Sequence, residues 1–188
     1  MHQIRQLFEQ KDKLSDADWA YFSARLVRTA YPKKHLVLKS GEVENTLSFI
    51  EKGLVRFYIP QPDKDLTFGF AFEGNFVSGY DSFLTRMPSH YAIETLVPTV
   101  LWHLTHNDLK DIYNNTAIGN TIGRHAAEDL FLKKSKREIS LLTQTAQQRY
   151  ESLFTEQPHL IHQIPLKYIA SYIGVTPQAL SRIRKRIT

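Results

Sequence analysis

Residues 166–186 have the sequence LKYIASYIGVTPQALSRIRKR, which predicts two short helices joined by a tight turn. Ile169 and Ile173 lie four residues apart, as on one face of a helix, and Gly174 suits the left-handed backbone that ends one. Thr176 then offers a hydroxyl as an N-terminal cap. The proline that follows is expected at the first helical position, where its missing N–H costs nothing.

The second of these helices presents polar and basic side chains on the side opposite Leu180 and Ile183. Arginine can donate two hydrogen bonds to a guanine edge, glutamine can pair with adenine, and a basic cluster attracts phosphates. The pattern is typical of a helix-turn-helix that binds DNA, the alternative being a helical hairpin with a solvated basic face. The residues predicted to contact DNA are Lys167, Tyr168, Thr176, Gln178, Ser181, Arg182, Arg184, Lys185 and Arg186.

The net charge of +5 is unevenly distributed along the 188 residues. Residues 133–188 contain ten Lys or Arg against three Asp or Glu, whereas residues 1–132 contain 14 against 16. A basic segment joined to a slightly acidic one is typical of a nucleic-acid module attached to a domain with another task. An acidic protein partner is the alternative explanation of the basic half.

The composition excludes several classes of protein. The chain has no cysteine, which excludes disulfides, thiolate catalysis and a cysteine-bound iron–sulfur cluster. An apolar content of 42% and the lack of any long apolar run predict a soluble cytoplasmic protein that does not enter a membrane. Catalytic motifs are missing, so we expect no enzyme, no catalytic residues and no cofactor. His103 with His106, and His159 with His162, lack a third ligand, so no metal site is expected.

The apolar pattern divides the chain before the basic segment into three parts. Residues 2–28 show helical spacing and predict two short helices, with Ser15 as the cap of the second. Residues 31–104 form short β-rich runs separated by Gly and Pro, which predicts an antiparallel β-roll or barrel. From Asn107 the spacing becomes helical again and predicts one long helix that ends in a hinge near residues 140–145.

At the quoted residues the sequence resembles the CRP/FNR family of bacterial transcription regulators. Further similarity lies in AQQRYESL at 146–153, IPLKYIA at 164–170 and LSRIRK at 180–185, which resemble the branch of the family widespread in Bacteroidetes. FIEKGLVRFY at 49–58 is similar to a strand, turn and strand of the family's β-roll. The resemblance implies a homodimer that binds a palindromic operator in double-stranded DNA, with RNA polymerase and an unknown small-molecule effector as further partners.

In this family the long helix forms the dimer contact. The resemblance assigns that contact here to Ile118, Ile122, Ala126 and Leu130. Two-fold symmetry favours this assignment, because a dimer can bind two DNA half-sites about one duplex turn apart. The alternative is a helix that simply packs on its own β-roll.

Family members that bind cyclic nucleotides have a Gly-Glu pair and, about ten residues later, an arginine followed by a small hydroxyl residue. Aligning residues 73–80 on that segment places Ser78 and Gly79 at the Gly-Glu pair, and Ser89 and His90 at the arginine and hydroxyl positions. Both charged ligands are therefore missing. A buried phosphate without a charge-assisted donor loses about 1.5–3 kcal/mol, so cyclic AMP is not the expected effector.

The effector pocket is therefore predicted from aromatic and cassette residues. Arg86 lies three residues before the family's arginine position and would replace that ligand if the loop were shifted. The alternative is a pocket filled by its own side chains, since aromatics in a β-roll are more often core. The predicted pocket residues are Phe70, Phe72, Gly79, Tyr80, Arg86, Ser89, His90 and Tyr91.

We therefore predict an α+β protein with three parts: an N-terminal double-stranded β-roll of the cyclic-nucleotide-binding, jelly-roll type (1–106), a long dimerisation helix with its hinge (107–142) and a C-terminal helix-turn-helix (143–188). The predicted function is sequence-specific DNA-binding transcription regulation without a response to cyclic AMP. The alternative function is a ligand-binding β-roll that acts through protein contacts and binds no specific DNA sequence.

Overall fold

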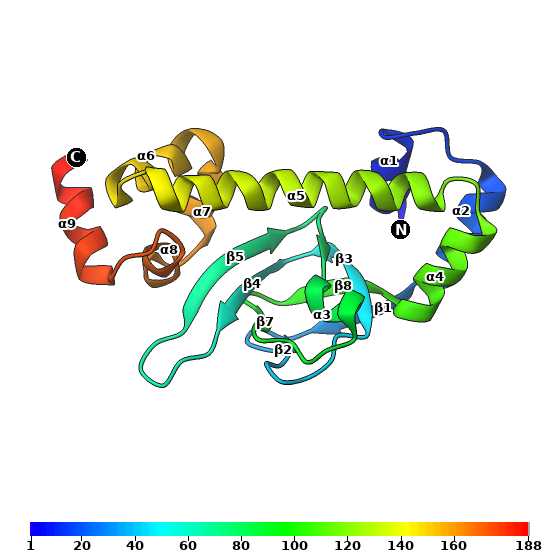
Figure 1. Ribbon diagram of the computed structural model, residues 1–188, viewed down its shortest axis with the longest axis horizontal. Coiled ribbons are helices and arrows are strands. Elements are labelled where there is room, and N and C mark those ends of the chain that lie inside the picture. Colours follow the sequence, from blue (N-terminus) through cyan, green and yellow to red (C-terminus); the bar gives the residue numbers. More distant parts are fainter. Residues whose placement is uncertain (188) are drawn as a thin grey trace. The chain divides into compact units, whose positions relative to one another are not determined.

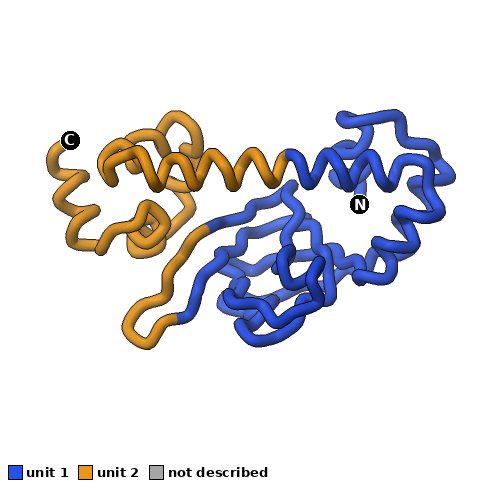
Figure 2. The backbone as a smooth tube through the Cα atoms, in the orientation of Figure 1, with its two compact units in different colours: residues 1–60, 69–128 blue, residues 61–68, 129–188 orange. Residues whose placement is uncertain are grey.

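A computed structural model describes residues 1–187 (Figure 1); Thr188, the last residue of the predicted DNA-binding segment, lies outside the described residues. The chain divides into two compact units (Figure 2). The first comprises residues 1–60 and 69–128, and the second comprises residues 61–68 and 129–188.

The first unit begins with the two short helices that the sequence predicts, α1 (His2–Glu9) and α2 (Asp16–Ser23). Ser15 caps α2 as expected, because its hydroxyl accepts a hydrogen bond from the Asp18 N–H at 3.0 Å. Buried side chains of α1 and α2, including Phe8 and Phe22, pack with Phe49 and Leu104 of the sheet. The helices therefore cover one face of the β structure.

Two four-stranded antiparallel sheets form the body of this unit, as the Gly- and Pro-punctuated runs predict. One sheet has the order β1-β8-β3-β6 and the other the order β2-β7-β4-β5. The strands are β1 (Val27–Tyr31), β2 (Leu36–Leu38), β3 (Thr46–Lys52), β4 (Leu54–Ile59), β5 (Leu66–Phe72), β6 (Phe76–Val77), β7 (Ala92–Thr95) and β8 (Thr99–Thr105). The short helix α3 (Tyr80–Thr85) lies between β6 and β7 in the sequence.

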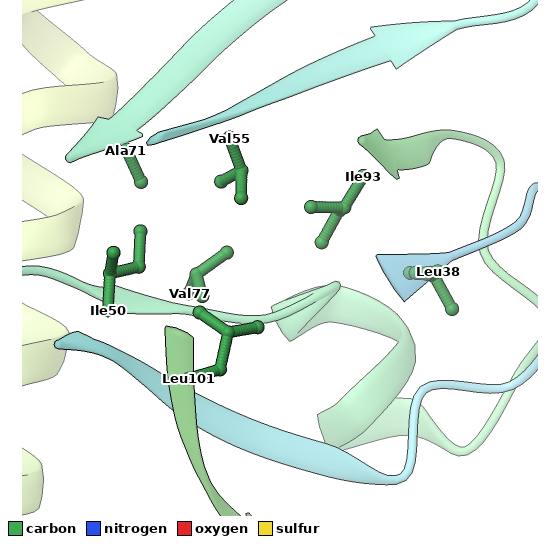
Figure 3. Close-up of a cluster of buried hydrophobic side chains, with 7 residues drawn as sticks. All are labelled: Leu38, Ile50, Val55, Ala71, Val77, Ile93 and Leu101. Atoms are coloured by element: carbon green, nitrogen blue, oxygen red, sulfur yellow. The ribbon is translucent and has the colours of Figure 1, made fainter. Parts of the chain in front are cut away.

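The core of the roll lies between the two sheets (Figure 3). Successive side chains of a strand point to opposite faces, so Ile50 lies in this core while its neighbour Phe49 packs on the helices outside. Gly53 joins β3 to β4 with φ +111°, and a Cβ there would lie 2.8 Å from the Thr99 Cα. The core side chains are Leu38, Ile50, Val55, Ala71, Val77, Ile93 and Leu101.

The prediction of one long helix from residue 107 is wrong in one respect, because the chain forms two consecutive helices there. The first, α4 (His106–Asn115), begins one residue before Asn107 and is capped by the Thr105 hydroxyl, which accepts from the Asp108 N–H at 3.1 Å. Thr116 then has an extended backbone, and its hydroxyl accepts from the Gly119 N–H at 3.0 Å. This contact lies at the first residue of the second helix, α5 (Gly119–Thr143).

The second unit contains the C-terminal helices α6 (Ala146–Glu156), α7 (Pro158–Gln163), α8 (Leu166–Tyr172) and α9 (Pro177–Ile187). The tip of the β4–β5 hairpin, residues 61–68, belongs to the same unit. The Ser171 hydroxyl accepts a hydrogen bond from the Thr67 N–H at 2.8 Å and donates one to the Asp65 carbonyl at 3.3 Å. Thr67 and Ser171 are both buried. The hairpin tip therefore completes the packing of α8.

Candidate nucleic-acid interface and effector pocket

The turn between α8 and α9 has the geometry that its sequence predicts. Gly174 adopts a left-handed conformation with φ +80°, and the Val175 N–H donates to the Ala170 carbonyl at 2.9 Å. The Thr176 hydroxyl accepts from the Ala179 N–H at 3.2 Å, and α9 begins at Pro177. Caps at both sides of the turn therefore fix the start of α9.

Replacing Gly174 with alanine is expected to lower the free energy of unfolding of the second unit by about 1–2 kcal/mol, the cost of a left-handed conformation for an L residue. A Cβ at Gly174 meets only atoms at ordinary contact distances, 3.6 Å or more, so backbone strain is the main cause. Chemical denaturation monitored by circular dichroism measures the change. Gly174→Asn is the control, because asparagine tolerates this conformation better than alanine. A larger loss for asparagine than for alanine would show that the strain argument is wrong.

One face of α9 is buried and the opposite face is exposed. Leu180 is buried and Ile183 is half-buried, as the sequence predicts. Gln178, Ser181 and Arg182 lie exposed on the other side of the helix. The terminal basic residues Arg184, Lys185 and Arg186 are exposed as well, as are Thr176 and Lys167, whereas Tyr168 is half-buried. The structure therefore places the predicted DNA contacts on or beside one accessible helix.

Two arginines of the basic segment have a structural role that the sequence did not reveal. The Arg149 guanidinium donates to the Ile173 carbonyl at 2.9 Å, and Arg137 donates to the Tyr172 carbonyl and lies 4.0 Å from the centre of the Tyr172 ring. Both carbonyls belong to the end of α8, where helical carbonyls lack partners within the helix. These arginines therefore stabilise the turn, and no local sequence signal distinguishes them from the exposed basic residues.

The predicted dimer residues are only partly available on the surface. Ile118 is buried in the core of its own chain. Ile122 is half-buried and packs against the cluster formed by α1, α2, α4 and the sheet. That part of the prediction is wrong, because the first turns of α5 are needed to close the first unit. Ala126 and Leu130 are exposed.

An exposed apolar face lies further along α5. Phe131 is 70% exposed and Leu142 is 78% exposed, and their separation of 11 residues is close to three full helical turns. They therefore lie on the same side of the helix. Exposed apolar side chains gathered on one side of a helix are typical of an interaction site in a globular protein. The exposed apolar residues of α5 are Leu130, Phe131, Leu132, Ile139, Leu141 and Leu142.

The loop that aligns with the family's arginine position is held by other groups. Ser89 is buried, its N–H donates to the Glu42 carbonyl at 2.8 Å, and its carbonyl accepts from the Gly41 N–H at 2.7 Å. Its hydroxyl donates to the Tyr91 carbonyl at 2.9 Å, while His90 is exposed. Neither side chain therefore presents a charged donor to the roll.

Arg86 is also committed to protein groups. Its guanidinium donates to the Glu44 carbonyl at 2.7 Å and to the Asn45 Oδ1 at 2.5 Å. Arg86 has a left-handed backbone, φ +61°, at the end of α3. In this conformation it joins α3 to the segment before β3 and does not take the place of the missing phosphate ligand.

The sequence did not reveal a buried carboxylate beside the cassette. Glu44 is only 5% exposed, and its carboxylate accepts from the Gly79 N–H at 3.1 Å and from the Thr46 N–H at 2.9 Å. Gly79 is the residue immediately before α3. The amide at the start of this helix is thus already satisfied by an internal anion, a contact between residues 35 positions apart that no local pattern predicts.

Aromatic side chains fill the inside of the roll near the cassette. The ring centres of Tyr91 and Phe57 lie 6.3 Å apart, and a Cβ at Gly69 would lie 3.4 Å from the Phe57 ring. The Tyr91 hydroxyl donates to the Asp81 carboxylate at 2.5 Å, and burial is the main cause of its raised pKa. Tyr80 stacks on the neighbouring Phe83 of α3.

Two of the predicted pocket aromatics do not line this interior. Ala71 of β5 belongs to the core between the sheets. Side chains alternate along a strand, so its neighbours Phe70 and Phe72 lie on the opposite face of β5. Their assignment to the effector pocket is therefore wrong, and Phe57, which the sequence prediction omitted, occupies the interior instead.

The described residues show neither a metal-binding cluster nor a transmembrane helix. Within residues 1–187 no three His, Cys, Asp or Glu side chains come together as a metal would require. Over the same residues, every helix is too short or too polar to cross a membrane.

The β-roll is similar to a known family of ligand-binding domains. Residues 28–116 match the family model of the cyclic nucleotide-binding domain. The matched segment begins in β1 and ends just after α4, so it covers the roll. The first unit therefore contains a β-roll of the cyclic nucleotide-binding type. No curated protein sequence matches the chain.

Solved structures similar to this chain include several bacterial regulators. The c-di-GMP responsive global regulator CLP of Xanthomonas campestris has a TM-score of 0.73 and 16% identity, with 92% of this chain and 91% of that chain covered. FixK2 from Bradyrhizobium japonicum has a TM-score of 0.72 and 17% identity, with 86% and 84% covered. A transcriptional regulator of the crp/fnr family from Eubacterium rectale, itself described as putative, has a TM-score of 0.70 and 17% identity, with 93% and 83% covered. At these identities the chain shares the fold of CRP/FNR-type regulators.

Proposed function

We propose that the protein is a sequence-specific DNA-binding transcription regulator of the CRP/FNR type, from the branch widespread in Bacteroidetes. The observation that carries this proposal is the exposed face of α9, where Gln178 and Arg182 lie one turn apart beside a terminal basic cluster. A helix capped at its start and supported by buried Leu180 can enter the major groove with its polar face toward the bases. Arg182 then contacts a guanine, and the basic cluster contacts phosphates.

The functional form in this proposal is a homodimer. The apolar face of α5 around Phe131 and Leu142 supports this form. If the same face of a second copy packs against it, the apolar residues of both chains are buried in one symmetric contact. Two-fold symmetry then presents two α9 helices to the two half-sites of a palindromic operator. An effector would act by changing the populations of two arrangements of this dimer.

We further propose that cyclic AMP is not the effector. A cyclic phosphate bound at the cassette would approach the start of α3, where the Glu44 carboxylate already accepts from the Gly79 N–H. Ser89 replaces the arginine that would neutralise it, and Arg86 bonds to the segment around Glu44. Like charges and a missing donor both oppose binding of the phosphate.

Isothermal titration of the full chain with cyclic AMP is expected to give no measurable binding heat up to about 1 mM ligand. This result corresponds to a binding free energy weaker than about −4 kcal/mol. Glu44→Ala removes the repulsion but restores no donor, so it is expected to leave cyclic AMP binding undetectable as well. Micromolar binding to the unmodified chain would show that the cassette accepts the nucleotide despite these substitutions.

The DNA-binding proposal is tested by selecting bound sequences from a random duplex pool with the full chain at fixed salt concentration. A palindromic motif with two equal half-sites is the expected result. A motif with a single half-site would contradict the dimer, and recovery of unselected sequence would contradict specific binding. Fixed salt is required because phosphate contacts make the affinity depend strongly on ionic strength.

A further inference from the structure

A partly open cavity of about 450 Å³ lies in the first unit, beside the cassette, whose Gly79 N–H bonds to the lining residue Glu44. Its walls come from β1, β2, the segment before β3, the end of β8 and the start of α4, and it is not lined by α3 or β7. None of the predicted pocket residues lines this cavity, so it adjoins the pocket that the resemblance predicts without sharing its residues. Small-molecule sites in proteins usually have volumes of about 300–1,000 Å³, so this cavity is large enough for a metabolite.

Two polar side chains of the lining, Tyr31 and His103, form a hydrogen-bonded chain with Ser48, which is buried outside the lining. The His103 ring bonds through Nε2 to the Tyr31 hydroxyl at 3.0 Å and through Nδ1 to the Ser48 hydroxyl at 2.7 Å. Burial lowers the pKa of His103 and so favours the neutral ring, in which one nitrogen donates and the other accepts. When Ser48 donates to the ring and the ring donates to Tyr31, the Tyr31 O–H remains to donate to a bound molecule. Stacking on His35, with ring centres 4.6 Å apart, holds the Tyr31 ring in place.

The remaining lining contains apolar side chains and charged groups that are mainly acidic. Val27, Val37 and Leu38 supply the apolar part. The lining carboxylates are Glu42, Glu44 and Asp108. Glu44 accepts from backbone amides, Asp108 accepts from the Thr105 N–H at 3.0 Å, and Glu42 lies 3.5 Å from Lys39. The one cationic side chain in the lining, Arg25, is paired with Asp111 at 2.6 Å and donates to the Tyr21 carbonyl. The cavity thus favours cations over anions.

We propose that this cavity is a second ligand site, which binds a small organic amine with an apolar body and a hydroxyl group at the end remote from the amine. The ammonium group lies among the carboxylates, the body contacts the valines and Leu38, and the hydroxyl accepts from Tyr31. Every group in the site belongs to the first unit, so binding of the ligand can be tested without DNA.

Three related probes test the proposal: tyramine, phenethylamine and para-hydroxyphenylacetate. Tyramine has both the amine and the hydroxyl, phenethylamine lacks the hydroxyl, and para-hydroxyphenylacetate has a carboxylate in place of the amine. Binding is measured on the isotope-labelled full chain without DNA, from the amide and His103 ring signals in nuclear magnetic resonance spectra. Leaving DNA out separates the result from that of the DNA-binding proposal.

We expect tyramine to bind with a dissociation constant near or below about 1 mM, phenethylamine to bind several-fold more weakly and the carboxylate at least about tenfold more weakly. The largest signal changes should lie at Tyr31, Val37, Val43 and His103, which surround the cavity. Equal binding of the anion, or no binding of any probe at about 10 mM, would overturn the proposal.

Two variants locate the site. Tyr31→Phe keeps the ring but removes the hydroxyl, so it should abolish the preference for tyramine over phenethylamine; Tyr58→Phe on β4, outside the cavity lining, should preserve that preference. Val43→Trp places a large side chain in the cavity lining and should prevent binding of all three probes. Tyramine binding that survives both Tyr31→Phe and Val43→Trp unchanged would place its site elsewhere and overturn the proposal.

Discussion

Replacing Arg182 with alanine is expected to weaken binding to the selected operator by about 1–3 kcal/mol, roughly 5- to 150-fold in Kd, while nonspecific binding changes little. Arg182 is exposed on α9, opposite the buried Leu180, so its removal leaves the core intact. The loss arises because a bidentate contact to a guanine edge disappears. Fluorescence anisotropy with operator and scrambled duplexes, at one salt concentration, measures both affinities.

Arg182→Lys separates base recognition from charge. Lysine keeps the positive charge but cannot form the planar pair of hydrogen bonds, so it should lose most of the specificity while retaining the nonspecific affinity. Equal losses for the operator and the scrambled duplex in Arg182→Ala would instead assign this residue to phosphate contact.

Replacing Phe131 with glutamate is expected to raise the dissociation constant of the homodimer by at least about 100-fold, or about 3 kcal/mol, and to make the chain monomeric at micromolar concentration. Phe131 is 70% exposed in the single chain, and a glutamate there would be buried without a partner at the centre of the proposed interface. Sedimentation equilibrium measures the association, and operator binding should weaken in parallel.

Met87→Glu is the matched control for this change. Met87 is 64% exposed and lies outside α5, so the same substitution there adds a charge without touching the proposed interface. A Phe131→Glu chain that remains dimeric like this control would show that another surface joins the two copies.

The C-terminal helices were predictable because the signals that specify them are local. Gly174, Thr176 and Pro177 act on the few backbone groups beside them, and the spacing of Ile169 and Ile173 predicts a buried face without knowledge of what covers it. All of these features occur in the structure as expected. The alternation of short β runs likewise predicted the roll.

The dimer face was not predictable in detail, since helical periodicity does not tell which partner covers an apolar residue. Ile118 and Ile122 have the right spacing for a helix interface, but Ile118 is buried in its own chain and Ile122 packs against the cluster of α1, α2 and α4. Phe131 and Leu142 are separated by a basic stretch that obscures their common side. Only the exposure of each side chain distinguishes the two sets.

The pocket was the least predictable region because its contacts join residues distant in the chain. Glu44 bonds to Gly79 and Arg86 bonds to Glu44, so the cassette is determined by a loop about 40 residues earlier. The wrong assignment of Phe70 and Phe72 to the pocket has a simpler cause. The register of β5 decides that Ala71 points inward, and shifting a strand by one residue exchanges its two faces.

The shared hydrogen bonds of Ser171 have a consequence for how this protein can be divided or recombined. The chain enters the second unit twice, first as the hairpin tip at residues 61–68 and again from residue 129 onward. A fragment that starts at residue 129 lacks the Thr67 amide and the Asp65 carbonyl that the Ser171 hydroxyl bonds. We therefore expect the C-terminal helices to need the hairpin tip for their native packing. A chimaera that exchanges these helices should include residues 61–68 of the same protein.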